Sequence, residues 1–353
     1  ALLEDKRLVE LHQGKTESTH IVGDIYLGQV KKILPGLNAA FIDVGSKRDG
    51  FLHYLDLGLY YNSVNKFTKM CMANSLDDAK FATIKEPKLE KNGKISDILK
   101  QGQLILVQIS KEAISTKGPR LCTEISFAGR YLVLVPFSDK VSVSQKIKSV
   151  EERNRLRKLI KSIKPDNFGI IIRTIAEGKS VADLDNDLKD LLSKWESLKK
   201  KLPKSLPPTK LVSELDKSSV ILREMLTEEF NNVYVNNTEL HEELKHYINS
   251  ICPEKENILH LYKMQTPIFE QFGVAGQIRN SFGKVVTIRS GIYLIIEQTE
   301  AMHVIDVNSG NRTKSSQDQE ENALMVNCEA AVEIARQMRL RDLGGIIVID
   351  FID

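Results

Sequence analysis

Two aspartates follow short apolar strands in the last part of the chain. Asp306 comes directly after Val304–Ile305, and Asp350 comes directly after Val348–Ile349. Apolar residues at helical spacing lie between them and end at Gly344–Gly345, which predicts a strand, helix, strand unit. Such a crossover makes the two strands parallel, so both aspartates stand at carboxyl ends, where open sheets place ligands.

Two carboxylates at neighbouring strand ends repel each other, and a hard divalent cation removes that repulsion. Mg²⁺ accepts one or two carboxylates, keeps several waters and binds phosphate oxygens, which suits hydrolysis of a phosphodiester bond. Asn308 lies on the same strand face as Asp306 and can donate to the scissile phosphate. The pattern leaves one alternative open, in which the strand-end aspartates only cap a helix or a turn.

Elements further back in the chain must position this pair. Short strands punctuated by Gly and Pro at 23–30, 39–44, 104–109 and 120–126 predict a small closed barrel of the OB type. The polar stretch from about 58 to 100 has weak periodicity, and we expect it to be an inserted loop.

A mixed segment follows the barrel. It contains predicted strands at 131–135 and 168–174, a basic helix at 150–163 and an amphipathic helix from Val181 to Leu198. The arginines and lysines of the basic helix are expected to form a solvated face. Beyond residue 211 we expect a helix at 239–251 and a further helix that ends at Phe272.

Composition bounds the class of protein. The 353 residues are 42% hydrophobic and 27% charged, which excludes a disordered or collagen-like chain and suffices for two or three domains. No apolar run approaches the roughly 20 residues of a membrane span. The 50 basic and 47 acidic residues nearly cancel, so any nucleic-acid surface must be local. Four widely spaced cysteines favour a soluble, cytoplasmic protein without a disulfide framework.

Several long strings resemble the ribonuclease E/G family of bacterial endoribonucleases. In the first half they are GDIYLG at 23–28, LPGL at 34–37, AAFID at 39–43 and GFL at 50–52. In the last part they are EQTEAM at 297–302, IDVNSG at 305–310, EIARQ at 333–337, RLRDLGG at 339–345 and IDFID at 349–353. Because these strings occur in the family's order, the resemblance is far more specific than one motif.

The resemblance implies an α+β chain of several subdomains. An RNase H-like subdomain would be split between residues 1–22 and 211–283, with an OB-fold barrel at 23–126 and a 5′-phosphate sensor at 127–210 inserted in it. A partial DNase I-like α/β catalytic subdomain would occupy residues 284–353.

The resemblance also implies a function. The family consists of Mg²⁺-dependent endoribonucleases, for which Mn²⁺ is a possible substitute, that cut single-stranded, AU-rich RNA into products with a 5′-phosphate and a 3′-hydroxyl. They act in rRNA processing and mRNA decay. Asp306 and Asp350 would hold the metal and, with Asn308, form the catalytic site. Two alternatives stay open: a non-catalytic module that binds single-stranded RNA, and, on fold analogy alone, a DNA phosphodiesterase.

Matching positions extend to the substrate contacts. Arg173 and Thr174 match a pair that embraces a 5′-monophosphate, and Gly129 and Val133 match other positions of that pocket. Where the family often has a supporting arginine this sequence has Gln145, so we expect weaker or differently arranged phosphate sensing.

In the barrel, Phe51 resembles an aromatic residue on which a base stacks, and Lys117 matches a position that grips the RNA backbone. Tyr61, with Tyr60 before it, would add a second stacking surface. The alternative for Phe51 is a place in the barrel core.

The sequence departs from the family at its end. The family continues into more of the catalytic subdomain and a cysteine pair that shares zinc between subunits, whereas this chain starts at Ala1 and stops at Asp353. Both ends look like cuts. We therefore expect no zinc and no family-type homo-oligomer here, and the shortening can leave the chain inactive.

Overall fold

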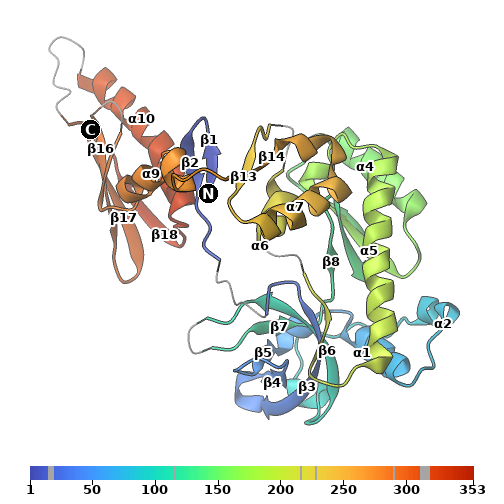
Figure 1. Cartoon of the computed structure of the whole chain (residues 1–353). Helices are drawn as coiled ribbons and strands as arrows, with labels where there is room; N and C mark the ends of the chain where they lie inside the picture. The colour runs from blue at the N-terminus through green and yellow to red at the C-terminus, as the bar shows by residue number, and fades with distance from the viewer. Residues whose placement is uncertain (15–19, 115–116, 215–216, 227–228, 289–290, 311–318) are drawn as a thin grey trace. The chain divides into compact units, whose positions relative to one another are not determined.

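The computed structural model describes residues 1–14, 20–114, 117–214, 217–226, 229–288, 291–310 and 319–353. The chain divides into two compact units (Figure 1). The first unit comprises residues 1–15, 232–245 and 254–353, and the second comprises 16–231 and 246–253. The predicted boundaries between the five family subdomains stay a prediction.

The second unit contains a closed five-stranded barrel, as the strand pattern predicts. In barrel order the strands are β3 (Ile25–Leu34), β4 (Ala39–Asp43), β5 (Gly50–His53), β7 (Arg120–Cys122) and β6 (Leu104–Lys111), and β6 closes on β3. A further strand, β12 (Thr209–Val212), pairs with β3. Short 3-10 turns η1 (Pro35–Leu37) and η2 (Tyr54–Leu57) follow β3 and β5. The barrel interior is filled by alternate residues such as Val30, Ile42 and Leu52.

The stretch from about 58 to 100 is not the loop that its weak periodicity suggested. It forms three helices, α1 (Tyr61–Met72), α2 (Asp78–Thr83) and α3 (Ile95–Ile98). Val64, Phe67 and Cys71 recur at steps of three and four and are buried, so one narrow stripe holds α1 in place. The ring of Phe67 stacks on Trp195 with centroids 4.7 Å apart.

Beyond the barrel, the second unit forms a four-stranded sheet covered by helices. Its order is β10 (Val141–Val143), β11 (Phe168–Ile172), β9 (Leu132–Pro136) and β8 (Phe127–Ala128). The predicted helices are confirmed as α4 (Val150–Ile163) and α5 (Val181–Lys201), and α5 begins at a capping box of Ser180 and Asp183. The remaining elements are η3 (Thr174–Ala176), η4 (Leu202–Lys204) and α6 (Lys217–Met225).

The first unit begins with a hairpin of β1 (Leu2–Glu4) and β2 (Arg7–Glu10). Helix α7 (Thr238–Ile251), of which residues 238–245 belong to this unit, is confirmed. A helix also ends at Phe272, as expected, but it is only four residues long. The segment after α7 forms η5 (Pro253–Ile258), β14 (Leu259–Leu261) and the short α8 (Ile268–Gln271), because β14 pairs in parallel with β13 (Val233–Val235). Helix α9 (Val274–Ser281) follows.

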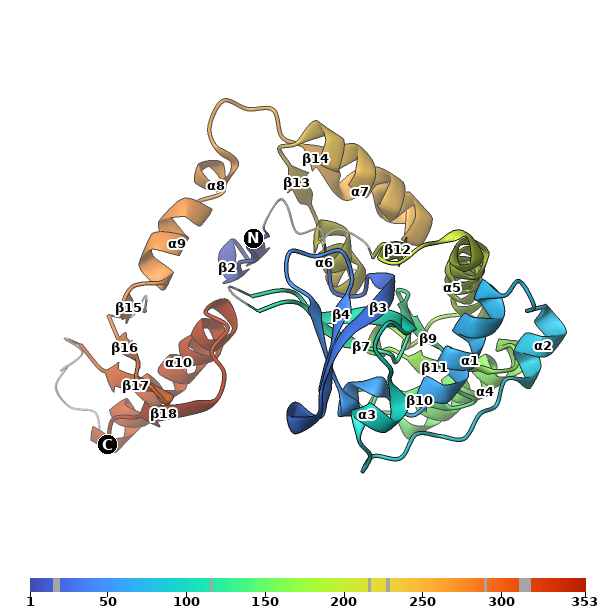
Figure 2. The ribbon, with the colours of Figure 1, turned by 90° about the horizontal axis from the view of Figure 1, so that it is seen from below.

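A four-stranded sheet ends the first unit. Its order is β15 (Val285–Thr287), β16 (Tyr293–Gln298), β17 (Met302–Asn308) and β18 (Ile346–Asp350). Helix α10 (Gln319–Leu340) packs on one face of it, as Figure 2 shows. The core between them contains Leu294, Ile305 and Val326. The predicted strand, helix, strand unit with parallel β17 and β18 is therefore confirmed.

Among the described helices, none combines the length and the hydropathy that crossing a bilayer requires.

Candidate active site

Asp306 and Asp350 are direct partners in the parallel pair of β17 and β18. Neighbouring strands lie about 4.8 Å apart, and residues in register project from the same face of a sheet. Ile305 and Val307 point into the core under α10, so Asp306 projects from the opposite, open face. The two carboxylates thus converge at the carboxyl ends of their strands; Asp306 is half-buried and Asp350 is exposed.

The side chain of Asn308 supports this pair. It lies two residues beyond Asp306 on the same face, and its Nδ2 donates to Asp306 Oδ2 at 2.7 Å. This bond fixes one oxygen of the Asp306 carboxylate. Among the described residues no cluster of three or more His, Cys, Asp or Glu side chains exists that could enclose a metal. Two carboxylates and an amide suit a hard cation that keeps most of its waters, which is how Mg²⁺ usually binds.

A second amide side chain, which the sequence reasoning missed, holds the backbone just past Asp350. Asn327 of α10 donates its Nδ2 to the carbonyl of Ile352 at 2.7 Å, and its Oδ1 accepts the Ile352 N–H at 3.1 Å. The strand ladder ends at Asp350, so this amide replaces the missing ladder bonds. An asparagine inside a helix is disfavoured unless its side chain has a hydrogen-bond partner. The position of Asn327 in a predicted helix was therefore the sequence feature that could have indicated this contact.

Helix α10 is also tied to the N-terminal hairpin through a buried carboxylate. Glu333 is 4% exposed and pairs with Arg7 at 2.8 Å and with Arg336 at 2.5 Å. Arg336 in turn donates to the carbonyl of Leu8 at 2.6 Å. Burial by itself would raise the pKa of Glu333, but the hydrogen bonds from Arg336 and Gln337 outweigh it and lower that pKa overall.

The four residues expected to bind a 5′-phosphate lie together in the second unit. Arg173 directly follows β11, and its Nη1 donates to the carbonyl of Gly129 at 3.0 Å. Val133 of β9 stands beside β11 on the outer face of the sheet, opposite Ile171. The hydroxyls of Thr174 and Ser144 are hydrogen-bonded at 2.9 Å.

A carboxylate already pairs with the arginine of this group. Glu224 of α6 forms an ion pair with Nη2 of Arg173, a contact that sequence reasoning missed. Burial, followed by the positive charge of Arg223, lowers the pKa of Arg173, although a guanidinium stays charged at any physiological pH. Gln145, at the supporting position, is exposed.

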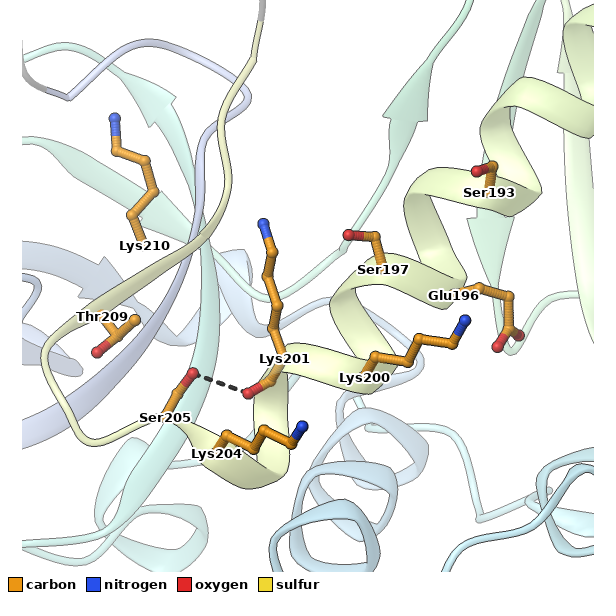
Figure 3. Close-up of a pocket in the computed structure, with 9 residues that line it drawn as sticks. All are labelled: Ser193, Glu196, Ser197, Lys200, Lys201, Lys204, Ser205, Thr209 and Lys210. Carbon is orange, nitrogen blue, oxygen red and sulfur yellow. Dashed lines mark hydrogen bonds between the residues drawn. The ribbon is translucent and has the colours of Figure 1, made fainter.

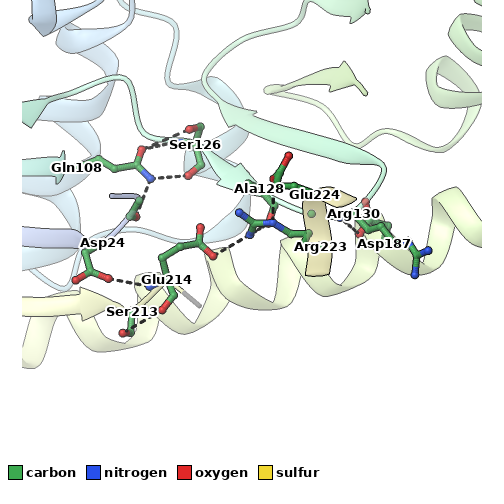
Figure 4. Close-up of polar contacts among 12 residues, drawn as sticks. Asp24, Gln108, Ser126, Ala128, Arg130, Asp187, Ser213, Glu214, Arg223 and Glu224 are labelled. Atoms are coloured by element: carbon green, nitrogen blue, oxygen red, sulfur yellow. Dashed lines mark hydrogen bonds and ion pairs between the residues drawn. The ribbon is translucent and has the colours of Figure 1, made fainter. Parts of the chain in front are cut away.

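A network of polar groups connects the surroundings of Arg173 with the start of the barrel (Figure 4). Arg223, the neighbour of Glu224, donates to the carbonyl of Ala128 at 3.1 Å and pairs with Glu214 at 2.9 Å. The Glu214 N–H donates to Asp24 Oδ1 at 2.8 Å. Asp24 is fully buried and also pairs with Lys210 at 2.7 Å. The aspartate of the GDIYLG string is thus a structural anchor.

On the barrel, Phe51 lies on the outer surface and not in the core. It is half-buried, and its ring meets Phe41 of the next strand edge to face, with centroids 6.1 Å apart. The Phe51 N–H donates to the Pro119 carbonyl at 2.8 Å, which brings the loop containing the exposed Lys117 alongside. A Cβ on Gly118 would come within 2.1 Å of the Asp49 carbonyl, so this close approach requires glycine. Sequence reasoning did not single out Phe41, although its place between two buried residues of a strand indicates an outward-facing ring.

Comparison with known proteins identifies the family of this chain. The sequence model of the Ribonuclease E/G family matches residues 126–353. The chain belongs to the ribonuclease E/G family. It is 39% identical to ribonuclease E of Nostoc sp. over 95% of this chain and 45% of the relative. It is 36% identical to ribonuclease G of Haemophilus influenzae and 35% identical to ribonuclease G of Escherichia coli, over 100% of this chain and 68% of each relative. It thus spans less than half of the Nostoc protein.

One expected contact of this ribonuclease E/G chain is corrected by the structure. Tyr61 is 2% exposed, and its hydroxyl accepts a hydrogen bond from Gln103 Nε2 at 2.9 Å. Burial raises the pKa of Tyr61 to about 12. The ring belongs to the barrel core and offers no face for a base. The adjacent Tyr60 is half-buried, with the ammonium of Lys88 5.8 Å from its ring centre.

The ribonuclease E/G chain also has a lysine-rich pocket of about 610 Å³ where α5 ends and β12 begins (Figure 3). Four lysines line it together with hydroxyl groups and one carboxylate, that of Glu196; the lysines are Lys200, Lys201, Lys204 and Lys210. Lys201 donates to the Leu211 carbonyl at 3.3 Å. The ammonium groups of Lys200 and Lys204 have no ion-pair partner among the described residues. The pocket therefore attracts anions.

Proposed function

We propose that this chain is the nuclease part of a Mg²⁺-dependent endoribonuclease that cuts single-stranded RNA. The observation that supports this most directly is the register of Asp306 with Asp350, beside Asn308, on an open sheet face. Membership of the ribonuclease E/G family supplies the substrate class.

Each side chain of the site has a separate task in this proposal. Asp306 and Asp350 hold the metal, and Asn308 orients Asp306 by its hydrogen bond and presents the amide edge of the site to the RNA. Bound Mg²⁺ would stabilise negative charge on the phosphate and lower the pKa of a coordinated water, and Mn²⁺ is expected to replace it.

We assign RNA binding to the barrel surface as well. The half-buried rings of Phe51 and Phe41 are suited to stacking bases, and the exposed Lys117 is suited to a backbone phosphate. The resemblance to the family implies that the RNA is AU-rich and that the products carry a 5′-phosphate and a 3′-hydroxyl. It also implies a role in rRNA processing and mRNA decay in the cytoplasm. Zinc and a homo-oligomer play no part in this proposal.

The pocket at Arg173 would select RNA with a 5′-monophosphate. The Arg173 guanidinium offers a forked donor, Thr174 a hydroxyl, and Gly129 and Val133 the wall beside it. Because Glu224 pairs with Arg173, a phosphate must displace a carboxylate, which makes the preference weaker than an empty pocket would give.

The test is cleavage of a 5′-monophosphorylated single-stranded RNA in MgCl₂ by a full-length form that contains this chain, with Asp306→Asn and a Glu297→Gln control. Glu297 is an exposed carboxylate on the neighbouring strand. We expect Asp306→Asn to lower the cleavage rate by more than about 100-fold, which is the upper end of the loss seen for residues that only support a metal ligand. Glu297→Gln is expected to cleave at the wild-type rate.

Equal cutting by wild type and Asp306→Asn would reject the proposal. RNA binding without cleavage, insensitive to chelator and without a Mg²⁺-dependent shift in melting temperature, would instead support a non-catalytic RNA-binding module. Cleavage of deoxyribose oligomers as efficient as that of RNA would identify a DNA phosphodiesterase.

A further inference from the structure

The open face of the sheet in the first unit has a fixed pattern of side chains beside the aspartates. On β16, Leu294 and Ile296 point into the core, so Tyr293 and Ile295 project from the open face. The antiparallel register places Tyr293 opposite Asn308 and Ile295 opposite Asp306. An aromatic ring therefore stands in the row next to the site.

The spacing of this ring suits a nucleotide. Side chains directly opposite on antiparallel strands have Cβ atoms about 5 Å apart, and diagonal neighbours lie at about 7–8 Å. Tyr293 is thus adjacent to Asn308 and diagonal to Asp306. Tyr293 is half-buried, so part of its ring surface is accessible.

The surroundings of Tyr293 are apolar and exposed. Val285 of β15, which pairs with Ile295 and is thus a diagonal neighbour of Tyr293, is 50% exposed. The hydroxyl-bearing Thr287 stands opposite Tyr293 on its other side and is also exposed. A face that combines exposed apolar side chains with a few polar groups at one end is typical of a ligand surface.

We propose that Tyr293 forms a nucleobase subsite, on which the base next to the scissile phosphate of single-stranded RNA stacks. This inference rests on the proposed nuclease function of Asp306 and Asp350. Sheets that bind single strands use aromatic residues on an open face in this way, and every base has a π-face that a tyrosine ring can accept. Stacking here holds the phosphate against the carboxylates and leaves Asn308 beside the sugar-phosphate backbone.

The experiment measures kcat/KM on RNAs that carry one abasic nucleotide at each position within three nucleotides of the cut. The variants are Tyr293→Ala, Tyr293→Phe and the control Val348→Ala on the same open face. With intact RNA, Tyr293→Ala is expected to lose about 5- to 150-fold, the range that stacking of one base spans. Tyr293→Phe keeps the ring and is expected to stay within about twofold, like Val348→Ala.

In the wild-type protein, an abasic nucleotide at one position next to the cut should lower kcat/KM by the same factor as Tyr293→Ala does on intact RNA. In Tyr293→Ala, an abasic nucleotide at that position should cause no further loss of kcat/KM. If the losses of kcat/KM from the abasic nucleotide and from Tyr293→Ala simply add, the subsite is overturned. A loss in Tyr293→Phe as large as that in Tyr293→Ala would also overturn it. Circular dichroism checks that each variant is folded.

A second readout does not require cleavage. RNA containing 5-iodouridine is irradiated on the Asp306→Asn variant, and the adducts are mapped by mass spectrometry. An adduct on Tyr293 supports the subsite, whereas adducts on Phe51 without any on Tyr293 overturn it and leave the nuclease proposal intact. A chain that neither binds nor cuts RNA overturns both.

Discussion

At the residue scale, amide side chains position the aspartates. Asn308 orients the Asp306 carboxylate, and Asn327 fixes the backbone two residues beyond Asp350. The second contact matters because β18 is an edge strand whose last paired residue is Asp350 itself. Without Asn327 the end of this strand would be held only by the partly buried Ile352.

Replacing Asn327 should therefore weaken metal binding. In Asn327→Leu both bonds to Ile352 are lost, Asp350 is no longer fixed, and the affinity for Mn²⁺ should fall roughly 10- to 100-fold, as for other supporting residues of metal sites. Electron paramagnetic resonance of free Mn²⁺ measures this, with Asn322→Leu on the same helix as control. Unchanged Mn²⁺ affinity in a folded Asn327→Leu protein would contradict the role.

The ion pair of Glu224 with Arg173 leads to a second prediction at this scale. Glu224→Gln removes the competing carboxylate, so RNA with a 5′-monophosphate should bind about two- to fivefold tighter relative to RNA with a 5′-hydroxyl, the range of a partly exposed ion pair. Fluorescence anisotropy gives both dissociation constants. Arg173→Gln should abolish the difference, and the exposed Glu177→Gln should leave it as in wild type. A smaller preference in Glu224→Gln would show that this carboxylate assists phosphate binding.

At the scale of elements, α10 connects the parts of the first unit. One face packs on the sheet, Asn327 holds the segment after β18, and Glu333 binds Arg7 of the hairpin. The folded state lowers the pKa of Glu333, so the unfolded chain takes up this proton more readily as pH falls. The stabilisation is complete above the ordinary glutamate value of 4.5 and is lost as pH falls below it toward the folded pKa.

Unfolding by urea at pH 7, 5 and 4 tests this contribution. Glu333→Gln should cost about 1.5–3 kcal/mol of unfolding free energy at pH 7, the usual value of hydrogen bonds to a charged group, and should show a shallower loss of stability between pH 5 and 4 than wild type. Glu297→Gln, an exposed surface carboxylate, should change the free energy by less than about 1 kcal/mol. An unaltered pH slope in Glu333→Gln would assign the acid sensitivity to other carboxylates.

At the scale of the whole molecule, charge is balanced overall but unevenly placed. The formal net charge is +3, yet the pocket at the end of α5 gathers four lysines and a single carboxylate. By contrast, the basic residues of α4 are spread along an exposed face and in part pair within the helix, as Arg155 does with Glu152. The pocket is therefore the better candidate for contacting RNA phosphates.

The salt dependence of RNA binding separates these two surfaces. If Lys200 and Lys204 each neutralise one phosphate, Lys200→Gln/Lys204→Gln should lower the slope of log K against log salt by about 1.4, at about 0.7 per phosphate for single strands. Lys158→Gln/Lys161→Gln on α4 should leave the slope unchanged. The reverse result would move the RNA path to α4.

The sequence by itself determined the elements whose signals are local. Helices α4 and α5 follow their apolar periodicity, the barrel strands follow their Gly and Pro boundaries, and the crossover of β17 and β18 brings Asp306 and Asp350 into register. Local patterns suffice there because hydrophobic period and chain direction decide the outcome within one element or one crossover.

Only the tertiary structure decided which side chains meet from distant parts of the chain. It turned the polar stretch after residue 58 into helix α1, buried Tyr61, and paired Arg173 with Glu224 and Asn327 with Ile352. No local pattern encodes these contacts, because burial and hydrogen bonding depend on the neighbour that packing supplies and not on the residue alone.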